Sequence, residues 1–270
     1  MIDVHYLGPK YTYTYLAAQK YFGEEANYIP AESIDQVFEK VNEDKDSRAI
    51  GIIPDENSLE GIINSTFDNL TKYDIKIQEC IEMDIQHYLL SNKDLALNKI
   101  EQVFSHAQAL AQCNEWLNNN LINVTRTATN STAVAVDNLY RSFSKPAAII
   151  GSIELAEVYK LKILEKIILP NNVTKFFIIS KNNGMNSFDK HFSWYAFSLP
   201  NESGSLYGAL KCFYDNKVNL THIHSRPNKL NNWEYVFYVC AENCSSYVVS
   251  ELTKITYNVK ILGSYEGEKL

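Results

Sequence analysis

The alternation of short apolar runs with amphipathic helical stretches is the feature that most constrains how this chain folds. Val4–Leu7, Ala49–Ile53 and Ala147–Ile150 are apolar runs of strand length, and stretches with helical periodicity separate them. Strands that alternate with helices are typical of α/β proteins, in which helices cover the sheet. We therefore expect two doubly wound α/β lobes over the first part of the chain.

Three segments have the pattern of the connecting helices. Ser33 and Gln36 fit a capping box, in which the serine accepts a hydrogen bond from the third helical amide and the glutamine reaches back. Apolar residues recur at helical spacing over Gln108–Leu117. A further helix is predicted over Ser131–Tyr140, which opens on two hydroxyl residues suited to capping.

The C-terminal part has a different pattern, which predicts a separate domain. Four strands are expected, at Trp194–Leu199, Leu220–Ser225, Trp233–Cys240 and near Val259–Leu262, and amphipathic helices follow the first and third of them. The order βαββαβ predicts a ferredoxin-like unit. A polar stretch at Asn182–Lys190 looks like a linker, so we predict domains over residues 1–181 and 191–270.

Charge and cysteine content exclude several classes of protein. The net charge of -7 leaves no obvious basic face for nucleic acid. No stretch approaches the ~18 apolar residues of a membrane helix, and the first residues do not resemble a signal peptide. Five cysteines without a CxxC pair favour reduced thiols, so we expect a cytoplasmic protein. His222 and His224 share one strand face but have no evident partners for zinc, so no metal site is expected.

Polar loops follow several of the predicted strands. In open α/β sheets, ligands bind at the carboxyl ends of strands, near helix N-termini. Gly8-Pro9, Pro54–Ser58, Ser105-His106 and Ser131-Thr132 occupy such positions. In Asn171–Phe177 a hydroxyl and a cation stand side by side where a polar loop enters an apolar strand. This arrangement suits an enzyme that acts on an anion with a hydroxyl leaving group.

Five of these segments resemble motifs of the prephenate dehydratases, in the same order along the chain. Leu7–Thr14 is similar to the family's Gly-Pro-x-Gly-Thr-Phe-Ser, and Ile53–Gly61 to Val-Pro-Ile-Glu-Asn-Ser-x-Glu-Gly. Ser105–Cys113 resembles Ser-His-Pro-Gln-Ala-Leu-x-Gln-Cys, Asn130–Ala133 the Ser-Thr-Ala segment, and Thr174–Phe176 the Thr-Arg-Phe signature. The resemblance implies a periplasmic-binding-protein-like catalytic domain of two lobes, followed by an ACT regulatory domain.

The resemblance also implies a reaction and roles for the residues. Prephenate would lose carbon dioxide and its ring hydroxyl to give phenylpyruvate, in phenylalanine biosynthesis. Thr174 would donate a hydrogen bond to the leaving oxygen, and Glu56 is a candidate general acid if its site raises its pKa. Lys175 would supply charge for a carboxylate, and Phe176 would pack near the ring. The remaining candidates are Asn57, as a catalytic donor, and Ser105, His106, Gln108, Ser131 and Thr132, as substrate-binding residues.

The ACT-like part carries altered forms of two effector motifs. Ser203–Leu206 corresponds to Pro-Gly-Ala-Leu, and His224–Pro227 to Glu-Ser-Arg-Pro. Family precedent implies phenylalanine as effector and a homodimer or homotetramer, with the effector site between two such domains. The implied effector residues are Gly204, Leu206, Asn219, Leu220, Ser225 and Arg226.

Departures from the family pattern keep other functions open. Lys175 replaces an arginine and loses its bidentate fork, Tyr11 replaces a glycine, and Asp55 replaces an apolar residue. His224 replaces the glutamate of the effector motif. The alternatives are a prephenate decarboxylase, an arogenate dehydratase and a noncatalytic sensor of an aromatic acid.

Overall fold

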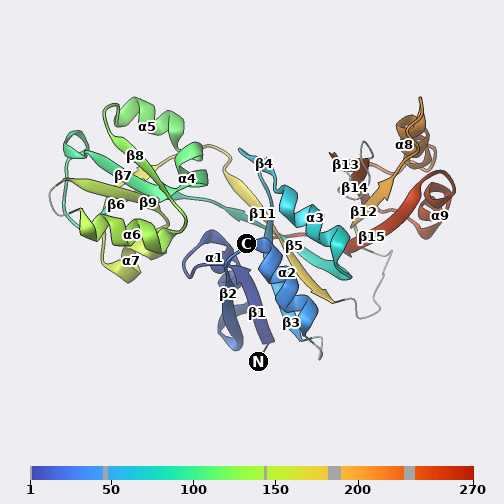
Figure 1. Ribbon diagram of the computed structural model, residues 1–270, viewed down its shortest axis with the longest axis horizontal. Coiled ribbons are helices and arrows are strands. Elements are labelled where there is room, and N and C mark those ends of the chain that lie inside the picture. The colour runs from blue at the N-terminus through green and yellow to red at the C-terminus, as the bar shows by residue number, and fades with distance from the viewer. Residues whose placement is uncertain (1, 45–47, 143–144, 182–189, 228–234) are drawn as a thin grey trace.

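The chain forms two α/β lobes followed by a further α/β unit (Figure 1). This computed structural model describes residues 2–44, 48–142, 145–181, 190–227 and 235–270, without the side chains of Thr132 and Ala133. The expected linker at 182–190 falls largely outside these ranges, as does the start of the strand expected at 233–240. The two-lobed α/β fold is confirmed.

The first lobe is built on five strands in the order β5-β11-β3-β1-β2. β1 is parallel to β2 and β3, whereas β11 lies antiparallel between β3 and β5, so the chain returns to this lobe after forming the second. The elements are β1 (Ile2–Leu7), α1 (Tyr13–Phe22), η1 (Gly23–Glu25), β2 (Ala26–Ala31), α2 (Ile34–Glu43), β3 (Ala49–Asn57), β4 (Gly61–Ile62), α3 (Asn64–Lys72), β5 (Ile75–Asp84) and β11 (Val173–Lys181).

The cap of α2 shows how local sequence starts these helices. Ser33 Oγ accepts a hydrogen bond from the Gln36 amide at 3.1 Å, as the capping box predicts. The Gln36 side chain reaches back to the amide of Glu32 rather than to that of Ser33, at 2.6 Å. Val37, Phe38 and Val41 then bury the apolar stripe of the helix.

The second lobe has its own five-stranded sheet in the order β10-β6-β9-β7-β8. Its elements are β6 (His87–Ser91), η2 (Leu97–Lys99), β7 (Gln102–His106), α4 (Ala107–Gln112), α5 (Asn114–Asn120), β8 (Thr125–Thr129), α6 (Thr132–Arg141), β9 (Ala147–Gly151), α7 (Ile153–Tyr159) and β10 (Lys162–Ile167). The prediction of a single helix over 108–117 is wrong, because two short helices, α4 and α5, are separated at Cys113. Cys113 is fully buried and non-helical, so α4 and α5 pack on the sheet as two short helices.

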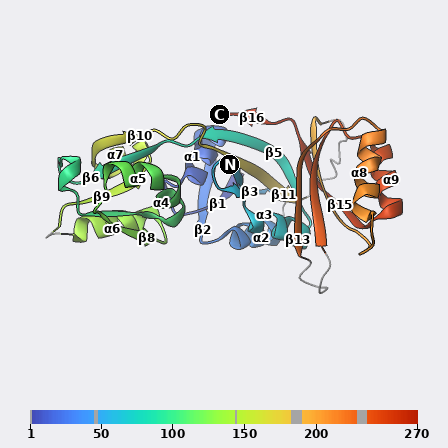
Figure 2. The ribbon, with the colours of Figure 1, turned by 90° about the horizontal axis from the view of Figure 1, so that it is seen from above.

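Residues 190–270 complete the fold with the predicted βαββαβ order. The elements are β12 (Phe192–Ser198), α8 (Ser205–Asp215), β13 (Leu220–Pro227), β14 (Tyr235–Glu242), α9 (Ser246–Ile255) and β15 (Tyr257–Tyr265). The four strands pair in the order β13-β14-β12-β15. Both helices cover its outer face (Figure 2). This arrangement confirms the ferredoxin-like unit.

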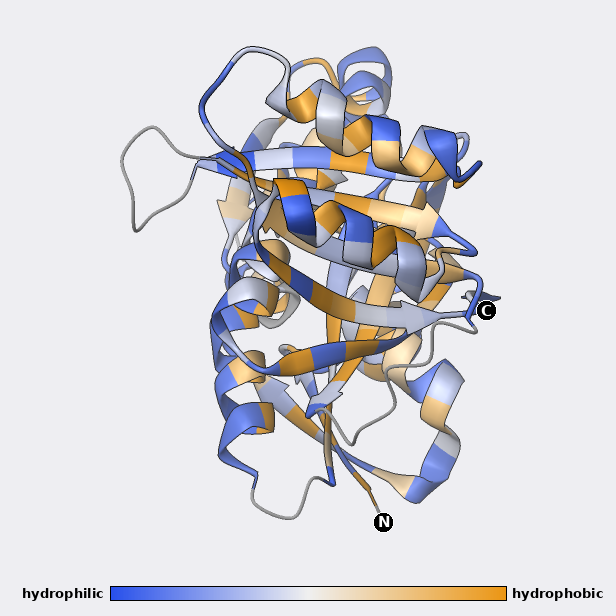
Figure 3. Ribbon diagram, turned by 90° about the vertical axis from the view of Figure 1, so that its right-hand side faces the viewer, coloured by the Kyte–Doolittle hydropathy of each residue, from blue (hydrophilic) through white to orange (hydrophobic). Residues whose placement is uncertain are grey.

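The sheets of the first lobe and of the C-terminal unit are continuous. β15 pairs with β5 at Gly263 and Ile77, and β16 (Glu268–Lys269) pairs with β5 further along. One apolar cluster spans the junction and includes Phe67, Phe177 and Trp194. Figure 3 shows hydrophobic residues concentrated in the strands, whereas hydrophobic and hydrophilic residues alternate along the helices. No helix in the described ranges is long and apolar enough to cross a membrane.

Candidate active site

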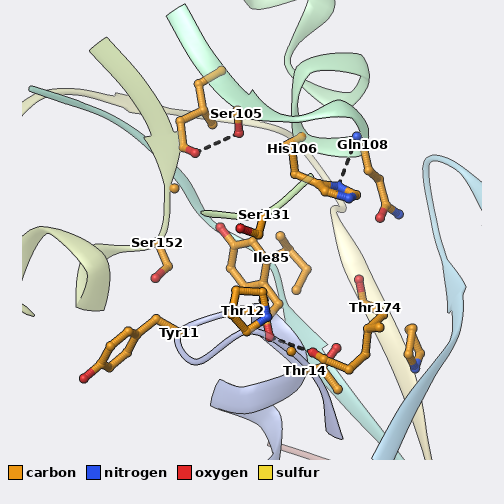
Figure 4. Close-up of a pocket in the computed structure, with 18 of the residues that line it drawn as sticks. Tyr11, Thr12, Thr14, Ile85, Ser105, His106, Gln108, Ser131, Ser152 and Thr174 are labelled. Atoms are coloured by element: carbon orange, nitrogen blue, oxygen red, sulfur yellow. Dashed lines mark hydrogen bonds between the residues drawn. The ribbon is translucent and has the colours of Figure 1, made fainter. Parts of the chain in front are cut away.

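A cavity of about 240 Å³ lies between the two lobes and takes its walls from both (Figure 4). The first lobe contributes the loop after β1, part of β3 and the start of β11. The second lobe contributes the carboxyl ends of β7 and β9 and the starts of the helices that follow. The predicted substrate residues that line it are Ser105, His106, Gln108, Ser131, Thr174 and Phe176.

Helix N-termini surround the cavity. Thr12, His106, Ser131 and Ser152 occupy the N-cap positions of α1, α4, α6 and α7, and all four line the cavity. Amides at a helix N-terminus carry partial positive charge and favour anions. No lysine or arginine is among the described residues that line the cavity. An anion bound here would therefore be held by dipoles and neutral donors.

Asn57 fixes the hydroxyl of Thr174. Asn57 Nδ2 donates to Thr174 Oγ1 at 2.9 Å, and both side chains are buried. The identity of Nδ2 is fixed because Asn57 Oδ1 accepts from the backbone amides of Leu59 and Glu60, at 3.0 and 3.2 Å. Since Thr174 Oγ1 accepts from Asn57, its own proton is available to a ligand in the cavity.

The serines that line the cavity differ in what they can offer. Ser105 Oγ donates to the carbonyl oxygen of Ile150 at 2.8 Å, so its proton is already used to tie β7 to β9. Ser131 Oγ accepts from the Val134 amide at 3.2 Å, which leaves its proton free to point at a ligand. Ser131 is thus a donor as predicted by its type, whereas Ser105 is held as an acceptor.

Three further predicted residues line the cavity: His106 caps a helix, Gln108 is exposed and Phe176 is buried. His106 Nδ1 accepts from the Gln108 amide at 3.4 Å and so caps α4. The Gln108 side-chain amide makes no hydrogen bond among the described residues and reaches the cavity from the exposed side. Phe176 is 1% exposed and contributes apolar wall.

Four of the predicted residues, Lys175, Glu56, Asn57 and Thr132, are not among the described residues that line the cavity. Successive side chains of a strand point to opposite faces. Lys175 follows Thr174 on β11 and turns away from the cavity, with its Nζ 3.6 Å from Glu82 Oε1. Glu56 precedes Asn57 on β3, and its carboxylate lies 3.0 Å from Nε2 of His222 in the C-terminal unit. The backbone of Thr132 begins α6, and its side chain lies outside the described part.

The buried acid of this region is Asp55, whereas Glu56 is only partly buried. Asp55 is the extra residue of a β-bulge, since Lys175 and Phe176 of β11 pair with Glu56 and Pro54 of β3. The residue is 2% exposed, and Oδ1 has no hydrogen-bond partner in the part of the chain that the structure describes. Burial, reinforced by the nearby Glu56 charge, raises the pKa of Asp55 well above its ordinary value.

Several cavity residues were not among the predicted ones. Ser152 is 5% exposed, and its Oγ has no partner among the described residues. The signal for it was available, since it comes just after the apolar run Ala147–Ile150 and occupies the N-cap of a helix, as Ser131 does. Tyr13, Thr14 and Gln112 also line the cavity, and they belong to the motif segments Leu7–Thr14 and Ser105–Cys113 without having been singled out as site residues. His87 lines it too, and nothing in its local sequence distinguishes it from a core residue.

The predicted effector residues lie at the start of α8, in the turn before β13 and on β13. Gly204 has a positive φ of 87° at the N-cap of α8, and Leu206 follows it. Ser225 is exposed, whereas Arg226 faces the first lobe, with Nη2 3.3 Å from Asp68 Oδ2. Asn219 Nδ2 donates to Glu242 Oε2 at 3.0 Å, and Leu220 begins β13. Their role stays a prediction.

His222 and His224 complete the contact with the first lobe. His224 Nε2 lies 3.0 Å from Asn64 Oδ1, next to the contact of His222 with Glu56. Among the described residues there is no cluster of three His, Cys, Asp or Glu side chains that could hold a metal ion.

Comparison with known proteins identifies the family. The prephenate dehydratase family model matches residues 4–184. The chain is 37% identical to the bifunctional chorismate mutase/prephenate dehydratase of Aquifex aeolicus, over 98% of this chain and 73% of that protein. It is 36% identical to the prephenate dehydratase of Methanocaldococcus jannaschii, over 97% of each chain.

Two solved structures show the same fold over the whole chain. The prephenate dehydratase from Staphylococcus aureus is 27% identical with a TM-score of 0.84, and covers 98% of this chain and 100% of that one. The prephenate dehydratase from Arthrobacter aurescens in complex with L-Phe is 25% identical with a TM-score of 0.87, and covers 98% and 90%. The chain therefore belongs to the prephenate dehydratase family, whose members are hydro-lyases.

Proposed function

We propose that the cavity between the lobes binds prephenate and that the Thr174 hydroxyl assists departure of its ring hydroxyl. Prephenate carries a ring carboxylate, a pyruvyl carboxylate and a hydroxyl across the ring. The N-termini of α1 and α6, with Ser131 and Gln108 as neutral donors, supply the attraction for the two carboxylates. Phe176 and Ile85 supply the apolar wall against the ring.

The reaction needs little acid–base chemistry from the protein. The bond between the ring and its carboxylate breaks, and that electron pair enters the ring as carbon dioxide leaves. The bond to the hydroxyl oxygen breaks with its electrons, and the ring becomes aromatic. Thr174 donates a hydrogen bond to the departing oxygen, which leaves as hydroxide and takes one proton from the solvent to become water. No step requires a metal or an organic cofactor.

Poor solvation of the leaving carboxylate is the second contribution of the cavity. A carboxylate without a paired cation gains more from becoming neutral carbon dioxide than one held in a salt bridge. No lysine or arginine is among the described lining residues, which suits this requirement at the ring carboxylate. Lys175, paired with Glu82, is left to a structural role.

The observation that carries this proposal is the bond from Asn57 Nδ2 to Thr174 Oγ1. It sets the threonine hydroxyl as a donor at the cavity wall before substrate arrives. The direct test is to incubate the purified chain with prephenate and to identify the product. Phenylpyruvate is expected. A nonaromatic product that keeps the hydroxyl would instead identify a decarboxylase, and binding without turnover a sensor; arogenate in a parallel reaction measures the substrate preference.

The proposal extends to regulation by phenylalanine. Support comes from the C-terminal ferredoxin-like unit and from the relative that was solved with L-Phe. We expect phenylalanine to lower the rate of phenylpyruvate formation and to bind in calorimetry. An unchanged rate at saturating phenylalanine would remove it as an effector.

Oligomeric state and compartment belong to the same proposal. An effector site between two C-terminal units would make the chain a homodimer or homotetramer, which sedimentation would detect. A cytoplasmic location is supported by the five cysteines, which are all free thiols and mostly buried.

A further inference from the structure

We propose that Asn172 is a positioning residue that orients Thr174 and, through Gln112, holds the proton of His87 on Nε2. Asn172 is 4% exposed and is not part of the cavity lining. It lies in the loop that leads from the second lobe into β11, between residues of both lobes. The catalytic part of this inference rests on the proposed function, whereas the position of the proton does not.

A row of side-chain amides has its direction fixed at one end by the backbone. Asn57 Oδ1 accepts from two main-chain amides, and its Nδ2 lies 3.2 Å from the carbonyl oxygen of Val173. Asn57 Nδ2 must therefore donate to Asn172 Oδ1, at 2.9 Å. This leaves Asn172 Nδ2 to donate to Gln112 Oε1, at 3.4 Å. The orientation of each amide thus follows from the one before it.

The same reasoning determines the tautomer of His87. Gln112 Oε1 faces His87 Nε2 at 2.7 Å, and a carbonyl oxygen only accepts, so Nε2 must carry a proton. His87 is 2% exposed, and burial lowers its pKa, which favours the neutral ring. Nδ1 is then an acceptor, and it lies 2.9 Å from the hydroxyl of Tyr13.

This row of contacts joins the two sides of the cavity. Tyr13 and Thr174 come from the first lobe, and both line the cavity, as do His87 and Gln112 from the second lobe. With His87 Nδ1 as acceptor, the single proton of the Tyr13 hydroxyl faces two acceptors, Nδ1 at 2.9 Å and the carbonyl oxygen of Gln86 at 2.7 Å, and the tautomer of His87 decides whether both compete for it. Asn172 therefore determines how hydroxyls on both walls are presented.

Asn172→Asp reverses the row with little change of shape. One carboxylate oxygen still accepts from Asn57, and the other repels Gln112 Oε1. The Gln112 amide turns over and presents its Nε2 to both neighbours, so His87 Nε2 becomes an acceptor and its proton moves to Nδ1. A carboxylate is also a stronger acceptor than an amide, and it draws Asn57 Nδ2 away from Thr174 Oγ1. We expect kcat to fall roughly tenfold, as positioning is lost.

The test combines nitrogen NMR of the histidine rings with steady-state kinetics. ¹⁵N chemical shifts distinguish protonated from unprotonated ring nitrogens. The His87→Gln variant assigns the His87 signals, because they are missing from its spectrum. In the wild-type chain, Nε2 of His87 should be protonated and Nδ1 not; in Asn172→Asp the two should exchange. Asn171→Asp is the matched control, because it adds the same charge at the adjacent, exposed position. It should keep the wild-type spectrum and a kcat within about twofold.

Each outcome decides one part of the inference. A wild-type His87 with its proton on Nδ1 overturns the whole, and needs no variant to show it. In Asn172→Asp, a His87 proton that stays on Nε2, whether the new carboxyl is charged or neutral, shows that Asn172 does not control the tautomer. If the His87 proton moves to Nδ1 in Asn172→Asp while kcat is unchanged, Asn172 has no role in catalysis. If Asn172→Asp does not fold by circular dichroism, Gln112→Glu replaces it, and loss of the Nε2 proton there contradicts the scheme.

The two proposals fail separately. If the wild-type chain does not convert prephenate into phenylpyruvate, the proposed function fails, while the NMR result still decides whether Asn172 sets the His87 tautomer.

Discussion

At the scale of single residues, Asp55 stands out because a buried acid occupies a place that is apolar in the family motif. Asp55 is 2% exposed near Cys80, and its Oδ1 has no partner among the residues that the structure describes. A buried carboxyl without full hydrogen bonding favours its neutral form. The bulge that carries Asp55 also sets the direction of Glu56 and Asn57, so Asp55 lies on the strand that positions Asn57.

The sign of the pH dependence follows from the raised pKa of Asp55. The folded chain holds this proton more tightly than the unfolded chain, so stability is greatest below the unfolded pKa and falls as pH rises toward the folded pKa. Asp55→Asn should remove this slope, which is about 1.4 kcal/mol per pH unit for one proton. Denaturant unfolding at several pH values measures it.

Asp137→Asn is the matched control, because Asp137 is exposed on α6. Its profile should follow that of the wild-type chain. Parallel profiles for the wild-type chain and Asp55→Asn would contradict the assignment of a raised pKa to Asp55.

Residue identity alone predicted part of the site. Ser131 and Gln108 were found because polar residues follow strands at sheet ends, and Thr174 because a polar loop enters an apolar strand there; the ordered family motifs pointed to the same segments. Lys175 and Glu56 were misplaced because a motif gives residue types, whereas the face of the strand decides which of two neighbours reaches the cavity. Gln112 stood in a motif without being singled out, and His87 could not be found, because its role depends on partners from distant segments.

At the scale of elements, the junction of β15 with β5 depends on Gly263. Its φ is 150°, and a Cβ at this position would collide with the backbone of Ile77. A side chain there must push the two strands apart. The C-terminal unit is thus joined to the first lobe through a backbone contact that only glycine allows.

Gly263→Ala should therefore destabilise the fold by about 3 kcal/mol or more, the upper range for a steric insertion into a packed site. Thermal unfolding followed by circular dichroism measures this. Gly267→Ala is the matched control, since Gly267 also has a positive φ, of 88°, but the nearest atom to its added Cβ is 3.6 Å away. If both variants lose the same stability, left-handed backbone strain rather than the contact with Ile77 explains Gly263.

Elements with strong local signals were predictable, and those set by packing were not. The cap at Ser131 and the βαββαβ order followed from hydrogen-bonding groups and periodicity. The break at Cys113 did not, because Leu110, Cys113 and Leu117 fit one continuous helix. The local sequence gives no signal for the division, and Cys113 lies in the buried cluster of the second lobe.

At the scale of the whole molecule, the active cavity depends on the chain crossing twice between the lobes. It leaves the first lobe after β5 and returns through Asn171 and Asn172 into β11, so Thr174 faces helices of the second lobe. The C-terminal unit contacts the back of the same lobe through His222 and Glu56, one residue from Asn57. The first lobe and the C-terminal unit therefore share one sheet (Figure 1).

The most direct measurement compares prephenate turnover in Thr174→Val, Thr174→Ser and the wild-type chain. Valine keeps the shape of threonine without the hydroxyl, and serine keeps the hydroxyl. We expect kcat to fall by about 10²-fold or more in Thr174→Val, the scale for losing one hydrogen-bond donor to a developing oxyanion, and to stay near wild type in Thr174→Ser. A Thr174→Val enzyme that forms phenylpyruvate at the wild-type rate would contradict the account.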